Sequence, residues 1–217
     1  DAGVQRFIYV SALGATSDPV HPYLYSKWMA EEEVHRSPIP SVVLRFANAF
    51  GPGDVFLNLM AAQAKLSPLV PVAGAGTAQF QPIAVSDIAR CLILACDRWD
   101  LDGSTLELAG PDLYSYDQLV DLVAETVGVR ITKVHVPPRI MGAFARSIGY
   151  MMKHPIVTPG EARLLLMDNV AAPPSVEKVF GFRPSALEGN LGYLRGVGWL
   201  DAVRLHLGST PVHILDW

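Results

Sequence analysis

The sequence is poor in the features that mark several classes of protein. It has only two cysteines among 217 residues and a formal net charge of −4. It has no basic stripe of the kind that nucleic-acid-binding proteins carry. No stretch approaches the roughly 20 apolar residues that a membrane-spanning helix needs. Ahead of the first apolar segment, at Phe7, there is no glycine-rich turn between a strand and a helix. We therefore expect neither a nucleic-acid partner nor a membrane-spanning helix.

The cysteines and histidines are not spaced to hold a metal. Cys91 and Cys96 lie on one predicted helix, about 140° apart around its axis, so they neither form a disulfide nor share a metal ion. The six histidines show no ligand spacing, and His21 beside Pro22 is typical of a solvated or capping group. We interpret both cysteines as core thiols in a reducing compartment. We expect a cytoplasmic protein, with a membrane-peripheral one as the alternative.

What the sequence does contain is ample apolar material for a globular core. Hydrophobic residues make up 50% of the chain, and its mean hydropathy is +0.27. The apolar runs at residues 7–10 and 41–46 flank a helical segment that Pro38 and Pro40 end. Runs that are continuously apolar predict a strand–helix–strand unit in a parallel sheet covered on both faces. We assign the charged residues 31–33 and Arg36 to the wet side of that helix.

The rest of the chain alternates between helices and strands before it becomes helical. The expected elements are, in order, a helix at 54–65, a strand at 80–85, a helix opened by Ser86 and Asp87 that reaches Arg98, a strand at 104–109, a helix capped by Ser115 and Gln118, a strand at 129–136, and helices from Pro138 onward. Residues 74–76 have the sequence Gly-Ala-Gly but lead into a strand, so we interpret them as a turn. This order predicts an α/β fold, the C-terminal part of a doubly wound parallel sheet with a smaller, mainly helical substrate lobe.

A methionine-rich stripe follows Pro138. Its members recur at helical spacing and are Ile140, Met141, Phe144, Ile148, Met151 and Met152. We interpret the stripe as a core-facing helix or an active-site lid, and a membrane-surface or partner-docking face is the alternative.

The most informative pair of residues is Tyr23 and Lys27. Residues four apart lie on one face of a helix, where a lysine ammonium can lower the phenol pKa from its usual value of about 10. A phenol with a lowered pKa can donate or accept a proton near neutrality. The spacing alone is weak support, because a surface tyrosine and lysine on an amphipathic helix would show it too.

Several motifs in order carry a resemblance to a known family. They are residues 7–15, 23–27, 54–58, 81–87, 110–111, 158–170 and 193–200. With these motifs the whole chain resembles the atypical, extended short-chain dehydrogenases/reductases of the NAD-dependent epimerase/dehydratase type. Within that family it is most similar to the group formed by the nucleotide-binding accessory subunit of respiratory complex I and its bacterial relatives.

The resemblance implies a Rossmann-like fold and an NAD(P)(H) cofactor, with NADP(H) slightly favoured. It implies that Lys27 hydrogen-bonds the nicotinamide ribose and that Tyr23 faces the substrate carbonyl or alcohol. The backbone at residues 46–48 (Phe46, Ala47 and Asn48) would line the nicotinamide end, and Phe80 and Gln81 would border the substrate. Residues 1–136 would form the second half of the cofactor-binding domain with interleaved substrate-lobe segments, and residues 137–217 a mainly helical lobe. The N-terminal dinucleotide-binding half would be absent.

One position departs from the family pattern. Family enzymes place a serine or threonine at the end of the first strand, where this sequence has Ala12, with Ser11 one residue early. Neighbouring strand residues face opposite sides of a sheet, so Ser11, the third candidate catalytic residue, is displaced from the expected place. Two functions therefore stay open. One is an oxidoreductase or epimerase acting on a small molecule, and the other is a non-catalytic NAD(P)H-binding scaffold with a respiratory-complex or membrane-peripheral partner.

Overall fold

The computed structural model describes residues 3–140, 163–172 and 175–200, and the chain divides into two compact units. The first unit comprises Asp1–Ala49, Gln81–Leu113 and Asn169–Leu187. The second comprises Phe50–Phe80, Tyr114–Asp168 and Glu188–Trp217. This division differs from the boundary expected at residue 136, because residues 169–187 return to the first unit. Hydrogen bonds hold them there: Asn48 donates its backbone N–H to Asn169 Oδ1 at 2.8 Å, and Ala109 donates to Ser175 Oγ at 3.0 Å.

A parallel three-stranded sheet forms the centre of the first unit. Its strands are β1 (Phe7–Ala12), β2 (Ser41–Phe46) and β7 (Thr105–Leu108), in the order β1-β2-β7. Helix α1 (Pro22–Arg36) connects β1 to β2, so the expected strand–helix–strand unit is present. The helix starts with Pro22, whose missing N–H costs nothing at a helix N-terminus, and it ends before Pro38.

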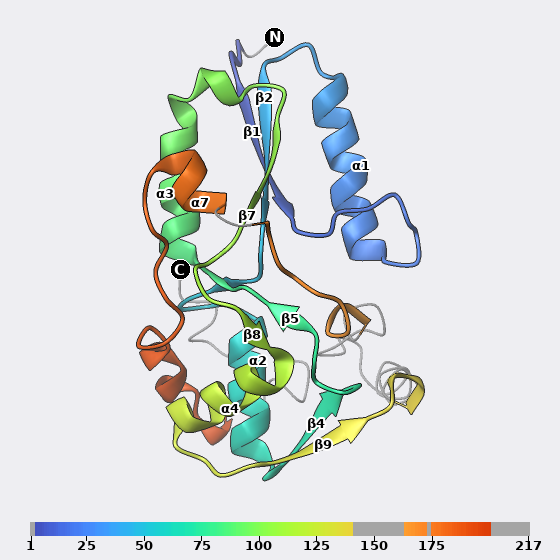
Figure 1. Ribbon diagram of the computed structural model, residues 1–217, viewed down its shortest axis with the longest axis vertical. Coiled ribbons are helices and arrows are strands. Elements are labelled where there is room, and N and C mark those ends of the chain that lie inside the picture. Colours follow the sequence, from blue (N-terminus) through green and yellow to red (C-terminus); the bar gives the residue numbers. More distant parts are fainter. Residues whose placement is uncertain (1–2, 141–162, 173–174, 201–217) are drawn as a thin grey trace. The chain divides into compact units, whose positions relative to one another are not determined.

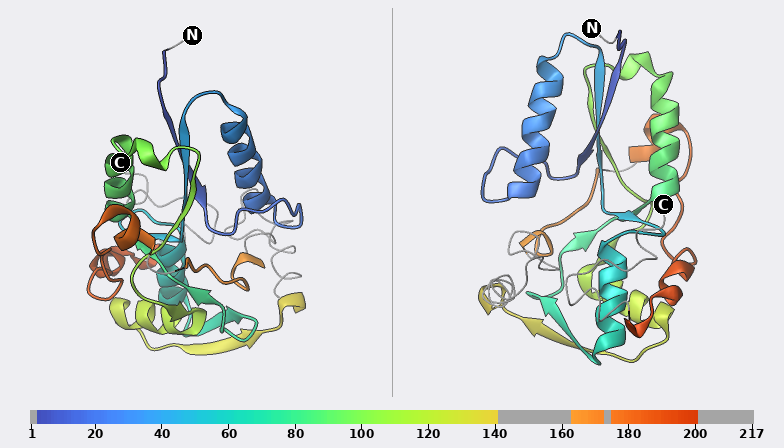
Figure 2. Two further views of the ribbon diagram at one scale, coloured as in Figure 1. Left: turned by 45° about the horizontal axis from the view of Figure 1, so that its top comes forward. Right: turned by 180° about the vertical axis from the view of Figure 1, so that it is seen from behind.

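Two helices cover opposite faces of this sheet. Figures 1 and 2 show α1 on one face and α3 (Val85–Cys96) on the other, with α7 (Ser175–Phe180) on the α3 side. The α3 face is the apolar core of the unit, where alternate residues of β2 and β7 meet the buried side of α3. The core residues on these elements are Val42, Leu44, Phe46, Leu108, Cys91 and Ala95.

The segment around residue 80 differs from the single strand expected at 80–85. The structure has two short strands, β5 (Gln79–Phe80) and β6 (Ile83–Ala84), and a third, β3 (Ala49–Phe50). Pro82, which lacks a backbone N–H, separates β5 from β6. Helix α3 begins at Val85 rather than at Ser86 and has no side-chain cap. The Asp87 carboxylate is buried and accepts a hydrogen bond from the backbone N–H of Ser185 at 2.6 Å.

The second unit mixes strands and helices in its described part. Strand β4 (Leu69–Ala73) pairs in parallel with β9 (Thr132–Val136), and β5 pairs antiparallel with β8 (Tyr114–Ser115). Helix α2 (Phe56–Leu66) packs against α4 (Tyr116–Val127), and the short 3-10 helix η2 (Gly192–Gly196) contacts both. The expected capping box is confirmed, because Ser115 and Gln118 exchange side-chain-to-backbone hydrogen bonds. Residues 74–76 form a turn after β4, as predicted.

The two cysteines have different environments. Cys91 is fully buried in the α3 core, where burial raises the pKa of its thiol to about 12. Cys96 is free and exposed, so the expectation of two core thiols holds for Cys91 alone. The methionine-rich stripe lies outside the described residues except for Ile140, which is exposed.

Candidate functional site

Tyr23 and Lys27 lie on the first two turns of helix α1. The Tyr23 side chain is half exposed, at 51%. The Lys27 ammonium donates a hydrogen bond to the carbonyl oxygen of Val10 at 3.3 Å, and it lies 5.7 Å from the centre of the Tyr9 ring. Val10 is near the carboxyl end of β1, so Lys27 joins the helix to the sheet at the edge where open α/β sheets bind their ligands.

The pKa of Tyr23 differs from the sequence-based expectation. Burial raises the pKa of its phenol above the usual value, and no lowering by Lys27 accompanies it. The physical reason is that the Lys27 ammonium is directed at a backbone carbonyl of β1. A lowered phenol pKa is therefore not a property of this arrangement, and proton transfer by Tyr23 stays a prediction.

Ser11 is buried, and its hydroxyl already has a partner. The hydroxyl donates to Glu31 Oε1 at 2.5 Å, on the α1 face of the sheet. By the alternation of a strand, the neighbouring Ala12 faces the α3 side. The catalytic assignment of Ser11 remains a prediction that this geometry does not favour, because its one proton is donated within the protein.

The sequence interpretation missed the residues that bind Ser11 into the sheet. Glu31 was assigned to the wet side of α1, but that assignment is wrong, since only 2% of Glu31 is exposed. Arg45 donates to both carboxylate oxygens of Glu31, from Nε to Oε1 at 2.9 Å and from Nη2 to Oε2 at 2.6 Å. These hydrogen bonds raise the pKa of the Arg45 guanidinium. A charged residue inside the apolar run 41–46 was the one signal for this pairing.

The backbone at residues 46–48 lies where β2 ends, and several of its polar groups are already paired. Leu13 donates its N–H to the carbonyl of Phe46 at 2.9 Å, and Ala47 donates to the carbonyl of Leu108 at 2.9 Å. The N–H of Asn48 is donated to Asn169. The carboxyl ends of β1, β2 and β7 are thus tied together near the expected nicotinamide position. The Phe46 and Ala47 side chains are buried.

Phe80 and Gln81, expected at the substrate, have structural partners. Phe80 belongs to the second unit and is fully buried, with its ring 5.5 Å from that of Phe56 and 5.9 Å from that of Tyr116. Gln81 belongs to the first unit. Its Nε2 donates to the carbonyl of Gly110 at 2.8 Å, and its Oε1 accepts from the N–H of Ala171 at 3.2 Å. The Gln81 side chain therefore holds two loops together, and its contact with a substrate stays a prediction.

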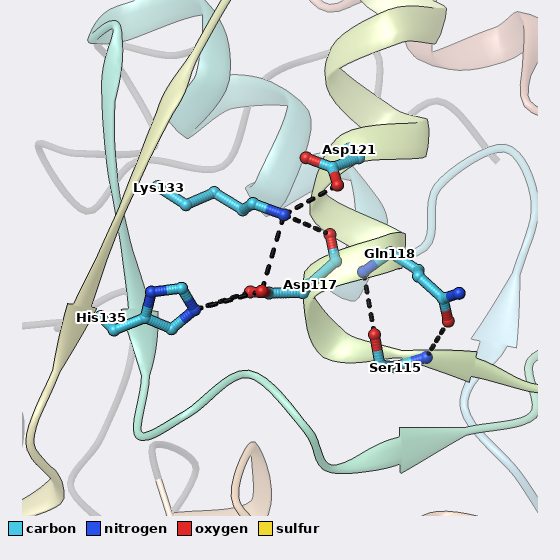
Figure 3. A network of polar contacts seen from close by, with 6 residues as sticks. All are labelled: Ser115, Asp117, Gln118, Asp121, Lys133 and His135. Carbon is cyan, nitrogen blue, oxygen red and sulfur yellow. Dashed lines mark hydrogen bonds and ion pairs between the residues drawn. The ribbon is translucent and has the colours of Figure 1, made fainter.

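A charged cluster joins β9 to the first turn of α4 in the second unit. Figure 3 shows Asp117 between Lys133 and His135, with Asp121 on the next turn of the helix. Lys133 Nζ lies 2.7 Å from Asp121 Oδ2 and 3.6 Å from Asp117 Oδ2, and His135 Nε2 lies 3.1 Å from Asp117 Oδ1. These groups satisfy one another. Across the described parts of the chain, no group of histidine, cysteine, aspartate and glutamate could hold a metal ion.

His21 precedes α1 directly and is close in sequence to Tyr23. Its side chain makes no capping hydrogen bond, and its Nδ1 is buried with no hydrogen-bond partner. It is therefore neither the capping nor the fully solvated group that the sequence suggested.

The chain is similar to several known proteins. Residues 2–108 match the model of the NAD dependent epimerase/dehydratase family. The mitochondrial NADH dehydrogenase (ubiquinone) 1 alpha subcomplex subunit 9 of Arabidopsis thaliana is 31% identical over 151 residues, which are 69% of this chain and 38% of that protein. The protein of the same name from Rattus norvegicus is 28% identical over 191 residues, 87% of this chain and 50% of that protein. The chain thus spans half or less of the length of these curated relatives.

Solved structures share the fold. The UDP-glucose 4-epimerase of Thermotoga maritima, solved with UDP-glucose, has a TM-score of 0.64 at 20% identity, covering 91% of this chain and 64% of that one. The UDP-glucuronic acid 4-epimerase of Bacillus cereus, solved with UDP-glucuronic acid and NAD, has a TM-score of 0.64 at 19% identity, covering 89% and 62%. At this identity the likeness concerns the fold alone, and it confirms the predicted doubly wound class. None of the helices described in this chain is long and apolar enough to cross a membrane.

Proposed function

We propose that the chain contributes the nicotinamide end of an NAD(P)(H) site, because residues 2–108 match the model of the NAD dependent epimerase/dehydratase family. The observation that carries the proposal is the place of Tyr23 and Lys27, on one face of α1 beside the carboxyl end of β1. Open α/β sheets bind ligands at that edge. The Tyr23 phenol is half exposed, and the Lys27 ammonium has one hydrogen bond, to a carbonyl. Both groups can therefore turn toward a ligand without disturbing the core.

In the catalytic form of the proposal, the cofactor supplies a hydride acceptor or donor. Tyr23 transfers a proton to or from the substrate oxygen, at its phenol Oη. Lys27 exchanges its hydrogen bond with the Val10 carbonyl for one to the nicotinamide ribose, and the charge it brings lowers the phenol pKa that burial raises. The product of this chemistry is an oxidised, reduced or epimerised small molecule.

A non-catalytic scaffold that binds NAD(P)(H) is the second candidate function. Two observations favour it. The hydroxyl of Ser11 is taken by Glu31, and the next position is Ala12, so the strand end offers no free hydroxyl to a substrate. The curated relatives carry the name of subunits of a respiratory NADH dehydrogenase. In this form the bound nucleotide stabilises the fold, and the partner is a respiratory complex or a membrane-peripheral assembly.

The open edge of β1 supports a further part of the proposal. Among the described residues β1 pairs only with β2, while Phe7 and Val10, on opposite faces of the strand, are both exposed. An unpaired edge with exposed apolar residues is suited to another strand. We infer that tight dinucleotide binding needs additional strands there. Comparing NADPH fluorescence titrations of the 217-residue chain and of a form that carries further strands beside β1 tests this, and micromolar binding by the 217-residue chain as a monomer would contradict it.

Substitution of Tyr23 separates the two functions. In the full-length protein, Tyr23→Phe should leave cofactor affinity within a few-fold and reduce any carbonyl-dependent oxidation of NADH or NADPH by about 10²–10⁴-fold. Tyr25→Phe is the matched control, because Tyr25 stacks on Trp28 through its ring, with centroids 5.9 Å apart. Equal turnover by Tyr23→Phe and wild type would refute the catalytic role. Tight cofactor binding without turnover on a panel of carbonyl substrates would favour the scaffold.

The dinucleotide itself is the remaining choice. We favour NADP(H) over NAD(H). The choice between them depends on the residues that contact the ribose 2′ position, which carries a phosphate in NADP(H) and a hydroxyl in NAD(H). Mass spectrometry of the nucleotide that co-purifies with the full-length protein gives the answer directly.

A further inference from the structure

A row of polar side chains crosses the α1 face of the sheet at one level. Ser11 on β1 lies opposite Arg45 on β2, and Arg45 lies opposite Glu107 on β7. Glu31 projects from α1 toward this row and forms hydrogen bonds with two of its members, Ser11 and Arg45. The Arg45 guanidinium also lies 3.6 Å from a Glu107 carboxylate oxygen. One helix side chain is thereby tied to two adjacent strands.

The attachment of α1 depends strongly on this contact. Only two of its 15 residues, Leu24 and Glu31, are buried. Leu24 lies near the start of the helix and Glu31 seven residues later, so Glu31 is the buried contact of the second half, where the exposed His35 also lies 3.1 Å from Thr105 Oγ1. A carboxylate held in two parallel hydrogen bonds by a guanidinium has a defined orientation, unlike an aliphatic side chain in a loose groove.

Glu31 is also in line with the proposed functional residues. Tyr23, Lys27 and Glu31 follow at intervals of four along α1 and therefore share one side of the helix. The backbone of the helix is stiff over this distance, about 12 Å at 1.5 Å per residue. Fixing Glu31 against the strands consequently fixes how far along β1 the phenol and the ammonium are placed.

We propose that Glu31 and Arg45, with Ser11, form a positioning clamp for Tyr23 and Lys27. The clamp sets the rotation and the height of α1 relative to β1, and Ser11 serves as a member of the clamp rather than as a group that contacts substrate. The proposal rests on the proposed function in one respect, since it takes Tyr23 and Lys27 to be the residues that need positioning.

The test uses variants of the full-length protein in which the hydrogen bonds of the clamp are lost but side chains of similar size occupy the positions of Glu31 and Arg45. Glu31→Gln keeps the shape and one charged partner, and the double variant Glu31→Leu/Arg45→Met replaces the pair with apolar groups of similar size. Glu33→Gln/Arg36→Met is the matched control, because that ion pair is on the same helix, 2.7 Å long and largely exposed on both sides. Thermal unfolding confirms that each variant is folded at the measuring temperature.

The readouts report position rather than stability. With ¹³C-labelled tyrosine, the Tyr23 resonance, assigned by Tyr23→Phe, should shift in both clamp variants and stay in place in the control. The resonances of Tyr116 and Tyr193 in the second unit should not move, whereas a general loosening of the protein would shift them too. Titration with NADH should show at least about tenfold weaker binding in the double variant, the size of effect expected when one charged hydrogen bond is misplaced.

The outcomes separate this proposal from the function it rests on. A folded double variant with an unmoved Tyr23 resonance and wild-type NADH affinity would overturn the clamp. If Tyr23 moves in the clamp variants but Tyr23→Phe and Lys27→Ala change neither turnover nor affinity, then the clamp exists and the proposed function is wrong.

Discussion

Helices α1 and α3 cover the same three strands from opposite sides, and the two faces are held together by different forces. On the α3 face, Leu44, Leu108 and Cys91 belong to a continuous apolar core. On the α1 face, the same strands present Ser11, Arg45 and Glu107, and the buried Glu31 carboxylate of α1 binds Arg45. Apolar packing tolerates small displacements, whereas paired charges and hydrogen bonds have one good geometry. The face with the defined geometry is the one that carries Tyr23 and Lys27.

The largest effect on stability is expected from breaking the polar face. Arg45→Met leaves the Glu31 carboxylate buried with Ser11 as its remaining partner, and this should lower the free energy of unfolding by about 3–5 kcal/mol. Urea unfolding of the full-length protein measures it. The control Arg36→Met removes an exposed charge from the same helix and should cost no more than about 0.5 kcal/mol. A loss in Arg45→Met as small as in the control would mean that α1 is not attached by this pair.

A change to the apolar face should have a somewhat smaller effect. Leu44 is fully buried, and Leu44→Ala should lower the free energy of unfolding by about 3 kcal/mol through lost burial and the cavity left behind. This loss should be the same at low and high salt, because no charge is involved. Leu94→Ala, at an exposed position on α3, should change stability by less than about 0.5 kcal/mol. Equal losses at Leu44 and Leu94 would show that the α3 face is not a packed core.

The smallest effect concerns the buried thiol and appears only at high pH. Burial raises the pKa of Cys91 from 9.0 to about 12. Between these values the unfolded chain loses the thiol proton while the folded chain keeps it, so the free energy of unfolding falls as pH rises. Cys91→Ala should therefore flatten the decline in stability between pH 9 and 12, and Cys96→Ala should not. An unchanged slope in Cys91→Ala would indicate that water reaches this part of the core.

Local sequence signals were sufficient for most of the first unit and for the start of α4 in the second. The apolar runs at 7–10 and 41–46 became β1 and β2, and the prolines that end the intervening helix stand where α1 stops. The capping box at Ser115 and Gln118 is a contact between residues three apart, so the sequence alone contains all of it. Placing Tyr23 and Lys27 on one face of a helix was possible for the same reason.

The contacts that define the candidate site could not be predicted because they join distant parts of the chain. In the sequence, Glu31 cannot be distinguished from its exposed neighbour Glu33. In the folded protein, Glu31 is buried because β2 places Arg45 within hydrogen-bonding distance of it. Gln81 was expected beside a substrate, and its amide instead binds Gly110 and Ala171. In both cases a polar side chain is withdrawn wholly or partly from water because a long-range partner compensates its lost hydration, and periodicity carries no information about that partner.

We propose that the α1 face supplies the nicotinamide end of a dinucleotide site. Fluorescence titration of NADH and NADPH against the full-length wild type and Lys27→Ala tests it most directly, with Arg36→Ala as a control for the loss of one positive charge on the same helix. Losing one charged hydrogen bond to the ribose should weaken binding by about ten- to a hundredfold in Lys27→Ala. The control should bind as the wild type does. Equal affinity in all three proteins would contradict the account and place the cofactor elsewhere.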